Sequence, residues 1–201
     1  MKKNCLFSNF IVIFISSIFI ISCSKDISEV IDYNKKFKNI SGGSLINAMA
    51  GEPSNLIAMI AGDSASSAIA ANIFNSLLKY DENLNYAPDL AESWQISNNQ
   101  KTITFKLKKN LQWSDGKPLT SADVLFTWKL ITNPNTRTPY ASDYQLVKSA
   151  SAPDPLTFKI TYESSYAPAL DTWTTLHILP RHILKDEDIN NTFFSRRPTG
   201  S

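Results

Sequence analysis

Residues 101–113, KTITFKLKKNLQW, carry the pattern that limits the fold of this chain most strongly. Apolar and polar side chains alternate along the first half of this segment, which is typical of a half-buried strand in an antiparallel sheet. The polar stretch SNNQ at 97–100 predicts a hairpin turn before the strand. LTFKITY at 156–162 alternates in the same way and predicts a second strand. The side chains expected to face inward are Ile103, Phe105, Leu107, Leu156, Phe158, Ile160 and Tyr162.

A loop and a helix-start signal follow the first of these strands. Asp115 and Gly116 predict a turn, because both residue types favour tight turns. Thr120 and Asp123 match the T-x-x-D form of the N-terminal capping signal, so a helix is expected to begin there. Asn133-Pro134 should end the helix, since the residue before a proline disfavours the helical backbone. The expected buried side of the helix consists of Val124, Leu125, Trp128 and Ile131.

Two further elements are expected earlier in the chain. The short apolar run SLINAMA at 44–50 predicts a buried strand. The turn-rich residues 51–66 predict a loop. Residues 66–79 repeat apolar side chains at four-residue spacing, which predicts an amphipathic helix with Ser66 or Ser67 as its cap.

The last part of the chain completes the expected order of elements. Residues 166–184 predict two short helices, and Pro180 breaks the segment between them. The chain as a whole has antiparallel strands, several helices and no βαβ rhythm. This order indicates a mixed α/β fold with α+β character.

The N-terminus has the plan of a bacterial lipoprotein signal. Lys2 and Lys3 precede the apolar run FIVIFISSIFII, which is shorter than the roughly 20 residues that span a bilayer. We therefore favour a signal peptide over a transmembrane anchor. The sequence IISC resembles a lipobox, so Cys23 is expected to receive lipid after cleavage. The expected parts are a lipoprotein signal peptide at 1–22, a tether at 23–40 and a domain at 41–201.

Cysteine usage and charge exclude several classes of protein. Cys5 leaves with the signal and Cys23 carries the lipid, so no cysteine remains for a disulfide or a thiolate metal site. Loss of Lys2 and Lys3 from the 20 basic residues leaves 18, against 18 acidic residues. A neutral mature chain without a basic patch does not indicate a nucleic-acid partner.

The clearest catalytic motif is Ser76-Leu77-Leu78-Lys79, which matches the S-x-x-K nucleophile motif of penicillin-recognising serine enzymes. On a helix, Lys79 would lie one turn from Ser76 and could activate its hydroxyl. However, Ser114 and Lys117 match the same pattern in a loop, and the partner motifs S-D-N and K-T-G are missing. We therefore expect Ser76 and Lys79 to be ordinary polar residues beside a buried leucine pair.

The two histidines do not indicate a metal site. His177 and His182 are five positions apart, so they do not share one helical face as an H-x-x-x-H pair does. Pro180 interrupts the segment between them, and no acidic residue lies there. No metal and no cofactor is expected.

Three segments together resemble a known family. They are GGSLINA at 42–48, IFNSLLKYDENLNYAPDLAESWQIS at 73–97 and KTITFKLKKNLQWSDGKPLTSADVLFTWKLI at 101–131. In element order, spacing and turn residues they are similar to the amino-terminal part of the family 5 extracellular solute-binding proteins. These proteins are the oligopeptide-, dipeptide- and nickel-binding receptors of ABC importers. The sequence departs from the family at Asn98-Asn99-Gln100, where Asp-Gly is common, and this affects only a turn.

The resemblance implies a fold and a role. The fold would be the first lobe, in part, of a two-lobed type II periplasmic-binding-protein fold. The role would be to capture peptides or another small solute outside the cytoplasm and pass them to ABC permease subunits, without catalysis. A lipid on Cys23 would hold such a periplasmic or extracytoplasmic receptor at the membrane. Within this scheme, WSDGKPLTSADVLF at 113–126 is scaffold.

The resemblance also implies where a solute would bind. By position, the first lobe contributes Gly62, Asp63 and Ser64, together with Tyr140 in TPYASDY. Asp63 could meet the amine of an extended peptide, and Tyr140 offers an apolar face with a polar tip. The alternatives are that Asp63 only caps the helix after it and that Tyr140 packs within its loop.

Family members are considerably longer than 201 residues, and RRPTGS at 196–201 resembles the start of a family turn. We therefore expect a fragment that binds solute weakly or not at all by itself. Two alternatives remain open: a serine enzyme that uses SLLK, and a lipid-anchored interaction protein that kept the partial lobe for another use.

Overall fold

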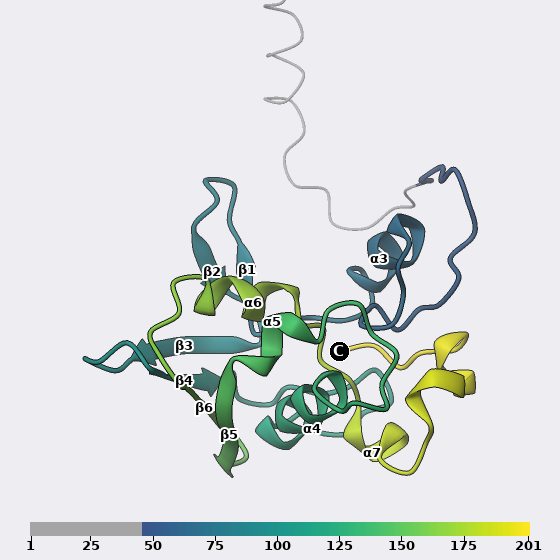
Figure 1. Cartoon of the computed structure of the whole chain (residues 1–201). Coiled ribbons are helices and arrows are strands. Elements are labelled where there is room, and N and C mark those ends of the chain that lie inside the picture. The colour runs from purple at the N-terminus through teal and green to yellow at the C-terminus, as the bar shows by residue number, and fades with distance from the viewer. Residues whose placement is uncertain (1–45) are drawn as a thin grey trace, which may run out of the picture. The chain divides into compact units, whose positions relative to one another are not determined.

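The computed structural model describes residues 46–201, and its compact part is residues 48–201 (Figure 1). Helices and strands alternate irregularly along this part, as expected for a mixed α/β chain. The elements are α3 (Ser64–Ala70), β1 (Leu78–Tyr80), β2 (Tyr86–Pro88), β3 (Ala91–Ile96), β4 (Thr102–Leu107), α4 (Ser121–Ile131), α5 (Ser142–Gln145), β5 (Val147–Asp154), β6 (Thr157–Tyr162), α6 (Ala169–Thr175), α7 (Arg181–Leu184) and 3-10 turns at Ile189–Asn191 and Phe193–Ser195.

The main sheet has four antiparallel strands in the order β3-β4-β6-β5, and β1 and β2 form a separate hairpin. In the central pair, Ile103 lies opposite Ile160 and Phe105 opposite Phe158. The alternation predicted for both strands is confirmed at most positions. The first strand ends at Leu107, Leu156 is only half-buried and Thr157, expected to face outward, is buried. The predicted hairpin turn is also confirmed, since Ser97 N donates to Thr102 O at 2.9 Å. The inward side chains that are buried are Ile103, Phe105, Leu107, Phe158, Ile160 and Tyr162.

The predicted loop and helix after β4 are confirmed. Gly116 has a φ of 81°, a left-handed conformation that glycine adopts without strain. Thr120 and Asp123 form the capping box of α4, in which Thr120 N donates to Asp123 Oδ2 at 2.8 Å. The buried side of α4 differs from the expected one: Val124 and Ile131 are buried, but Leu125 and Trp128 are half-buried. The polar residues Ser121, Asp123 and Thr127 are buried in their place.

Two predictions for the early part of the chain are wrong. Residues 46–50 form no strand and are exposed, with Ile46 95% accessible. An apolar run becomes a strand only where a neighbour pairs with it, and no strand in residues 46–201 does so here. The helix predicted at 66–79 ends at Ala70, because Leu78 pairs with Pro88 in the β1–β2 hairpin. This tertiary pairing overrides a local helical pattern.

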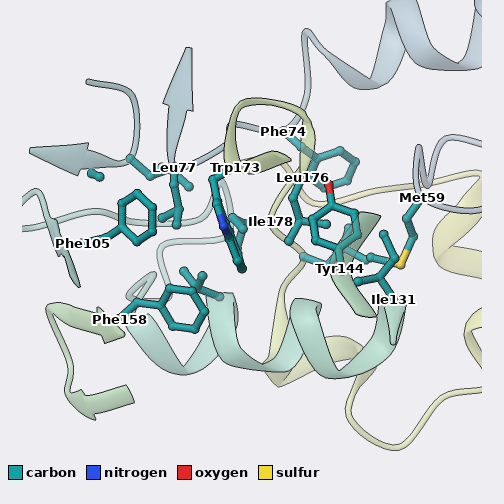
Figure 2. Close-up of a cluster of buried hydrophobic side chains, with 14 of the residues drawn as sticks. Met59, Phe74, Leu77, Phe105, Ile131, Tyr144, Phe158, Trp173, Leu176 and Ile178 are labelled. Atoms are coloured by element: carbon teal, nitrogen blue, oxygen red, sulfur yellow. The ribbon is translucent and has the colours of Figure 1, made fainter. Parts of the chain in front are cut away.

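The core is organised around Trp173 on α6, which has no accessible surface (Figure 2). Its ring centroid lies 5.2 Å from that of Phe158 and 5.9 Å from that of Phe105, both on the sheet. Its Nε1 donates to Tyr162 Oη at 3.0 Å, so the indole is both packed and hydrogen-bonded. This cluster holds α6 against the apolar face of the sheet.

The segment between α6 and α7 is held by side chains of α4. Leu179 N donates to Thr127 Oγ1 at 2.9 Å, and Thr127 Oγ1 donates to Asp123 O at 2.8 Å. Arg181 N donates to Asp123 Oδ1 at 3.0 Å. The predicted break at Pro180 is confirmed, and Pro180 precedes the first residue of α7. Polar groups on a helix thus satisfy backbone N–H groups of an extended segment that carries no strand partner.

These contacts predict the effect of removing one hydroxyl. In Thr127→Val the shape is nearly kept, but the buried Leu179 N–H loses its acceptor, so the free energy of unfolding should fall by about 1–3 kcal/mol. Urea denaturation measures this change. Thr127→Ser keeps the hydroxyl and should recover most of the loss. Equal stability of Thr127→Val and the wild type would show that this contact does not hold the segment.

Candidate functional site

A pocket of about 400 Å³ lies where three stretches of the chain that are distant in sequence come together. Its wall is built from the loop before α3, α3 itself, the residues from the end of α4 to α5, and the end of α6. The pocket is open to solvent on one side and its surface is mostly apolar. The lining residues are Ala58, Met59, Ser67, Ala71, Ile131, Tyr140, Asp143, Tyr144, Thr174, Thr175, Leu176 and His177.

Of the four site residues predicted from the sequence, only Tyr140 lines this pocket. The residue is 39% accessible, and its Oη donates to Ala61 O at 3.3 Å, which joins the loop after α4 to the loop before α3. Gly62 and Ser64 are exposed beside that junction and do not line the pocket. A direct contact of these two residues with a solute stays a prediction.

Asp63 has the capping role that was the alternative to ligand binding. Its Oδ1 accepts from Ser66 N at 2.7 Å, and its Oδ2 accepts from Ser66 Oγ at 2.7 Å and from Ser54 Oγ at 2.5 Å. These hydrogen bonds, first those from the Ser54 and Ser66 hydroxyls, hold the pKa of the Asp63 carboxyl well below its ordinary value. The cap of α3 is therefore Asp63 and neither Ser66 nor Ser67, and a role for Asp63 in binding an amine stays a prediction.

Tyr144 forms part of the pocket floor as a neutral hydrogen-bonding group. Its Oη donates to Thr172 O at 3.0 Å, and its ring meets Trp173 edge-on at a centroid distance of 6.0 Å. Burial raises the pKa of the Tyr144 phenol to about 12. The pocket floor is therefore continuous with the central core (Figure 2).

Sequence reasoning missed two titratable residues of the wall, Asp143 and His177. Asp143 is exposed on the short helix α5 and accepts from Ser142 Oγ at 3.2 Å. His177 follows α6 and is half-buried; burial lowers the pKa of its imidazole, and the charge of Asp89 opposes this effect. The only signal available for His177 was a lone polar residue in the apolar run TLHILP at 175–180.

The S-x-x-K motif does not form a catalytic pair. Ser76 is buried and its hydroxyl has no hydrogen-bond partner in the described part of the chain, while Lys79 is exposed within strand β1. In an extended strand, unlike a helix, side chains three positions apart point to opposite faces. The structure therefore does not place the amine one helical turn from the hydroxyl.

The two histidines lie in different surroundings. His182 Nε2 lies 2.7 Å from Asp115 Oδ2 in the loop after β4, whereas His177 faces the pocket. Within residues 46–201 no three histidine, cysteine or acidic residues are placed to hold a metal ion. Over the same residues no helix is both long and apolar enough to cross a bilayer. Cys23 and the signal segment lie outside the described residues.

The chain belongs to the bacterial extracellular solute-binding proteins of family 5, whose "family 5 Middle" model matches residues 85–201. It is 32% identical over 199 residues to the oligopeptide-binding protein AppA of Bacillus subtilis. This alignment covers 94% of this chain and 36% of that protein. This confirms the resemblance seen in the sequence.

Solved structures agree with this assignment. The chain matches AppA of Bacillus subtilis in complex with a nonapeptide with a TM-score of 0.71 and 28% identity, over 76% of this chain and 31% of that one. It matches the substrate-binding protein CtaP of Listeria monocytogenes with a TM-score of 0.72 and 31% identity, over 80% of this chain and 33% of that one. The chain thus spans about a third of the length of these relatives. The predicted fold class, part of one lobe of a two-lobed binding protein, is confirmed.

The surroundings of His177 predict how stability depends on pH. Because the pKa of His177 is lowered in the folded chain, the unfolded chain takes up this proton first as the pH falls. The contribution to stability is therefore complete above the ordinary value of 6.5 and is lost as the pH falls below it. Urea unfolding at about pH 7.5 and about pH 5.5 should show a decrease that His177→Gln reduces. An unchanged decrease in His177→Gln would assign it to other groups.

Proposed function

We propose that this chain contributes one wall of the solute site in a peptide-capturing receptor of an ABC importer. The observation that carries the proposal is the open pocket beside Tyr140, in a chain of family 5. The relatives support peptide as the solute, because AppA is named as an oligopeptide-binding protein. A solved relative, OppA of Haemophilus influenzae, also holds the peptide RPPGFSPFR.

Because the pocket is open to solvent, we expect these residues alone to bind solute weakly. Closure of two lobes buries most of a ligand's surface and supplies contacts from both sides. The pocket described here is open to solvent, and all of its lining residues lie within 58–177. We infer that the opposite wall comes from sequence outside these 201 residues, so this chain acts as a fragment of the binding unit.

We also infer that the chain is not an enzyme. The named relatives are binding proteins, and Ser76 has no activating partner among the described residues. The third possibility, a repurposed interaction protein, has no observation in its favour. A fluorescent β-lactam is therefore not expected to label the chain through Ser76.

Tyr140 tests the position of the solute. In protein purified from its native membrane, Tyr140→Ala should weaken peptide affinity about tenfold, because a large aromatic contact surface is lost. Tyr140→Phe keeps the ring and loses only the hydrogen bond to Ala61 O, so its affinity should stay near the wild-type value. Isothermal titration measures both. Unchanged affinity in Tyr140→Ala would remove this pocket from the solute site.

We propose that a lipid on Cys23 holds the receptor at the extracytoplasmic face of a membrane, close to its permease partner. A solute captured outside the cytoplasm must be delivered to a channel in the membrane. A lipid would hold the receptor near that channel without a membrane-spanning helix. A single acyl chain binds a membrane only reversibly, so stable anchoring needs more than one chain or a second contact. The partners are therefore a peptide, the permease subunits and the lipid bilayer.

Metabolic labelling with an alkynyl fatty acid tests the anchor and the fragment together. An antibody against residues 41–201 should recover labelled protein, and Cys23→Ala should abolish the label because it removes the acceptor thiol. Cys5→Ala is the matched control and should keep it, since Cys5 leaves with the signal. Label that persists in Cys23→Ala would contradict the anchor. A recovered band far above 22.4 kDa would show that a longer receptor contains these residues.

A further inference from the structure

The pocket wall carries a negatively charged side chain but no lysine or arginine. Among its lining residues Asp143 is the one carboxylate, and none is lysine or arginine. The other ionisable groups are the phenols of Tyr140 and Tyr144 and the imidazole of His177. A solute that enters the pocket therefore meets one fixed negative charge and no fixed positive charge in its wall.

Asp143 is available to a solute. Its carboxylate is exposed, and within residues 46–201 it takes part in no ion pair with a lysine or arginine. Its one recorded side-chain partner is the neighbouring Ser142 hydroxyl, at 3.2 Å. A carboxylate has room for several donors, so further hydrogen bonds can be made to a ligand.

Asp143 and Tyr140 lie in one turn of the chain. The Asp143 amide donates to Tyr140 O at 3.3 Å, and both side chains line the same pocket. A carboxylate and a phenol ring together suit an organic cation, because the carboxylate attracts the charge and the ring face stabilises it by a cation–π contact.

The rest of the wall does not offset this charge. His177 lies on another segment of the wall, and its burial favours the neutral imidazole. Tyr144 on the pocket floor is neutral, and Asp89, whose charge acts on His177, is itself acidic. Asp143 would therefore repel a solute carboxylate, and no cationic side chain of the wall would bind it. Such repulsion disfavours anionic solutes.

We propose that this pocket selects solutes that carry a cationic side chain, an ammonium or guanidinium group, and that Asp143 determines this preference. The proposal rests on the proposed function, since it names the class of peptide accepted by the same site. The apolar wall formed by Met59, Ile131 and Leu176 would contact the aliphatic stem of such a side chain.

Histidine NMR tests the proposal on the full chain, because the sequence contains only two histidines. In tag-free protein labelled at the histidine rings, His177 reports on the pocket and His182, beside Asp115, serves as the internal reference. The probes are the tripeptides Ala-Lys-Ala, Ala-norleucine-Ala and Ala-Glu-Ala, which share their termini. The His177 signal should shift saturably with Ala-Lys-Ala at a concentration about tenfold below that needed for Ala-Glu-Ala. The His182 signal should not move.

The variant Asp143→Asn should reduce this preference to about twofold while leaving the response to the norleucine peptide unchanged. Glu92→Gln, an exposed acid on β3 outside the pocket, is the matched control and should keep the preference. Equal responses to the three peptides, or a preference that survives Asp143→Asn, would overturn the inference while leaving solute binding in place. If no peptide moved the His177 signal up to tens of millimolar, the inference would also fall, and the Tyr140 affinities would then decide the proposed function.

Discussion

The hydrogen bonds from α4 to the chain after α6 are the contacts on which the rest of the arrangement depends. Thr127 accepts from Leu179 N, and Asp123 accepts from Arg181 N while it also closes the capping box of its own helix. These bonds satisfy backbone groups that have no strand partner. They also determine where the segment before them can lie, and that segment, Thr174–His177, is one wall of the pocket.

The opposite end of this wall is held by packing. Trp173, directly before it, is buried between the sheet and Tyr144 (Figure 2). The four wall residues therefore lie between this aromatic cluster and the hydrogen bonds donated by Leu179 N and Arg181 N. A surface held at both ends loses little conformational entropy when a ligand arrives. The fold thus holds this stretch of the pocket wall at both ends.

Local chemistry determined which elements the sequence could predict. The alternation at 101–107 and 157–162 and the capping box at Thr120 are complete within a few residues, so each was predicted correctly. The segment at 71–79 has a helical spacing, but its end pairs with Tyr86–Pro88 in a hairpin, and β5, with the sequence VKSASAPD, has no clear apolar alternation that predicts a strand. Both depend on partners that a local pattern does not contain. The site follows the same rule: Tyr140 came from the family resemblance, whereas Asp143 and His177 become neighbours of one pocket only through the tertiary fold.

The most direct test of the central claim is to locate a bound peptide by photo-crosslinking. The probe is a nonapeptide with one benzophenone side chain, irradiated with the protein in native membranes and mapped by mass spectrometry. We expect crosslinks within the three stretches that line the pocket, residues 58–71, 131–144 and 174–177. Crosslinks confined instead to the second cavity, which Tyr86, Ile96 and Tyr166 line beside the β1–β2 hairpin, would contradict it.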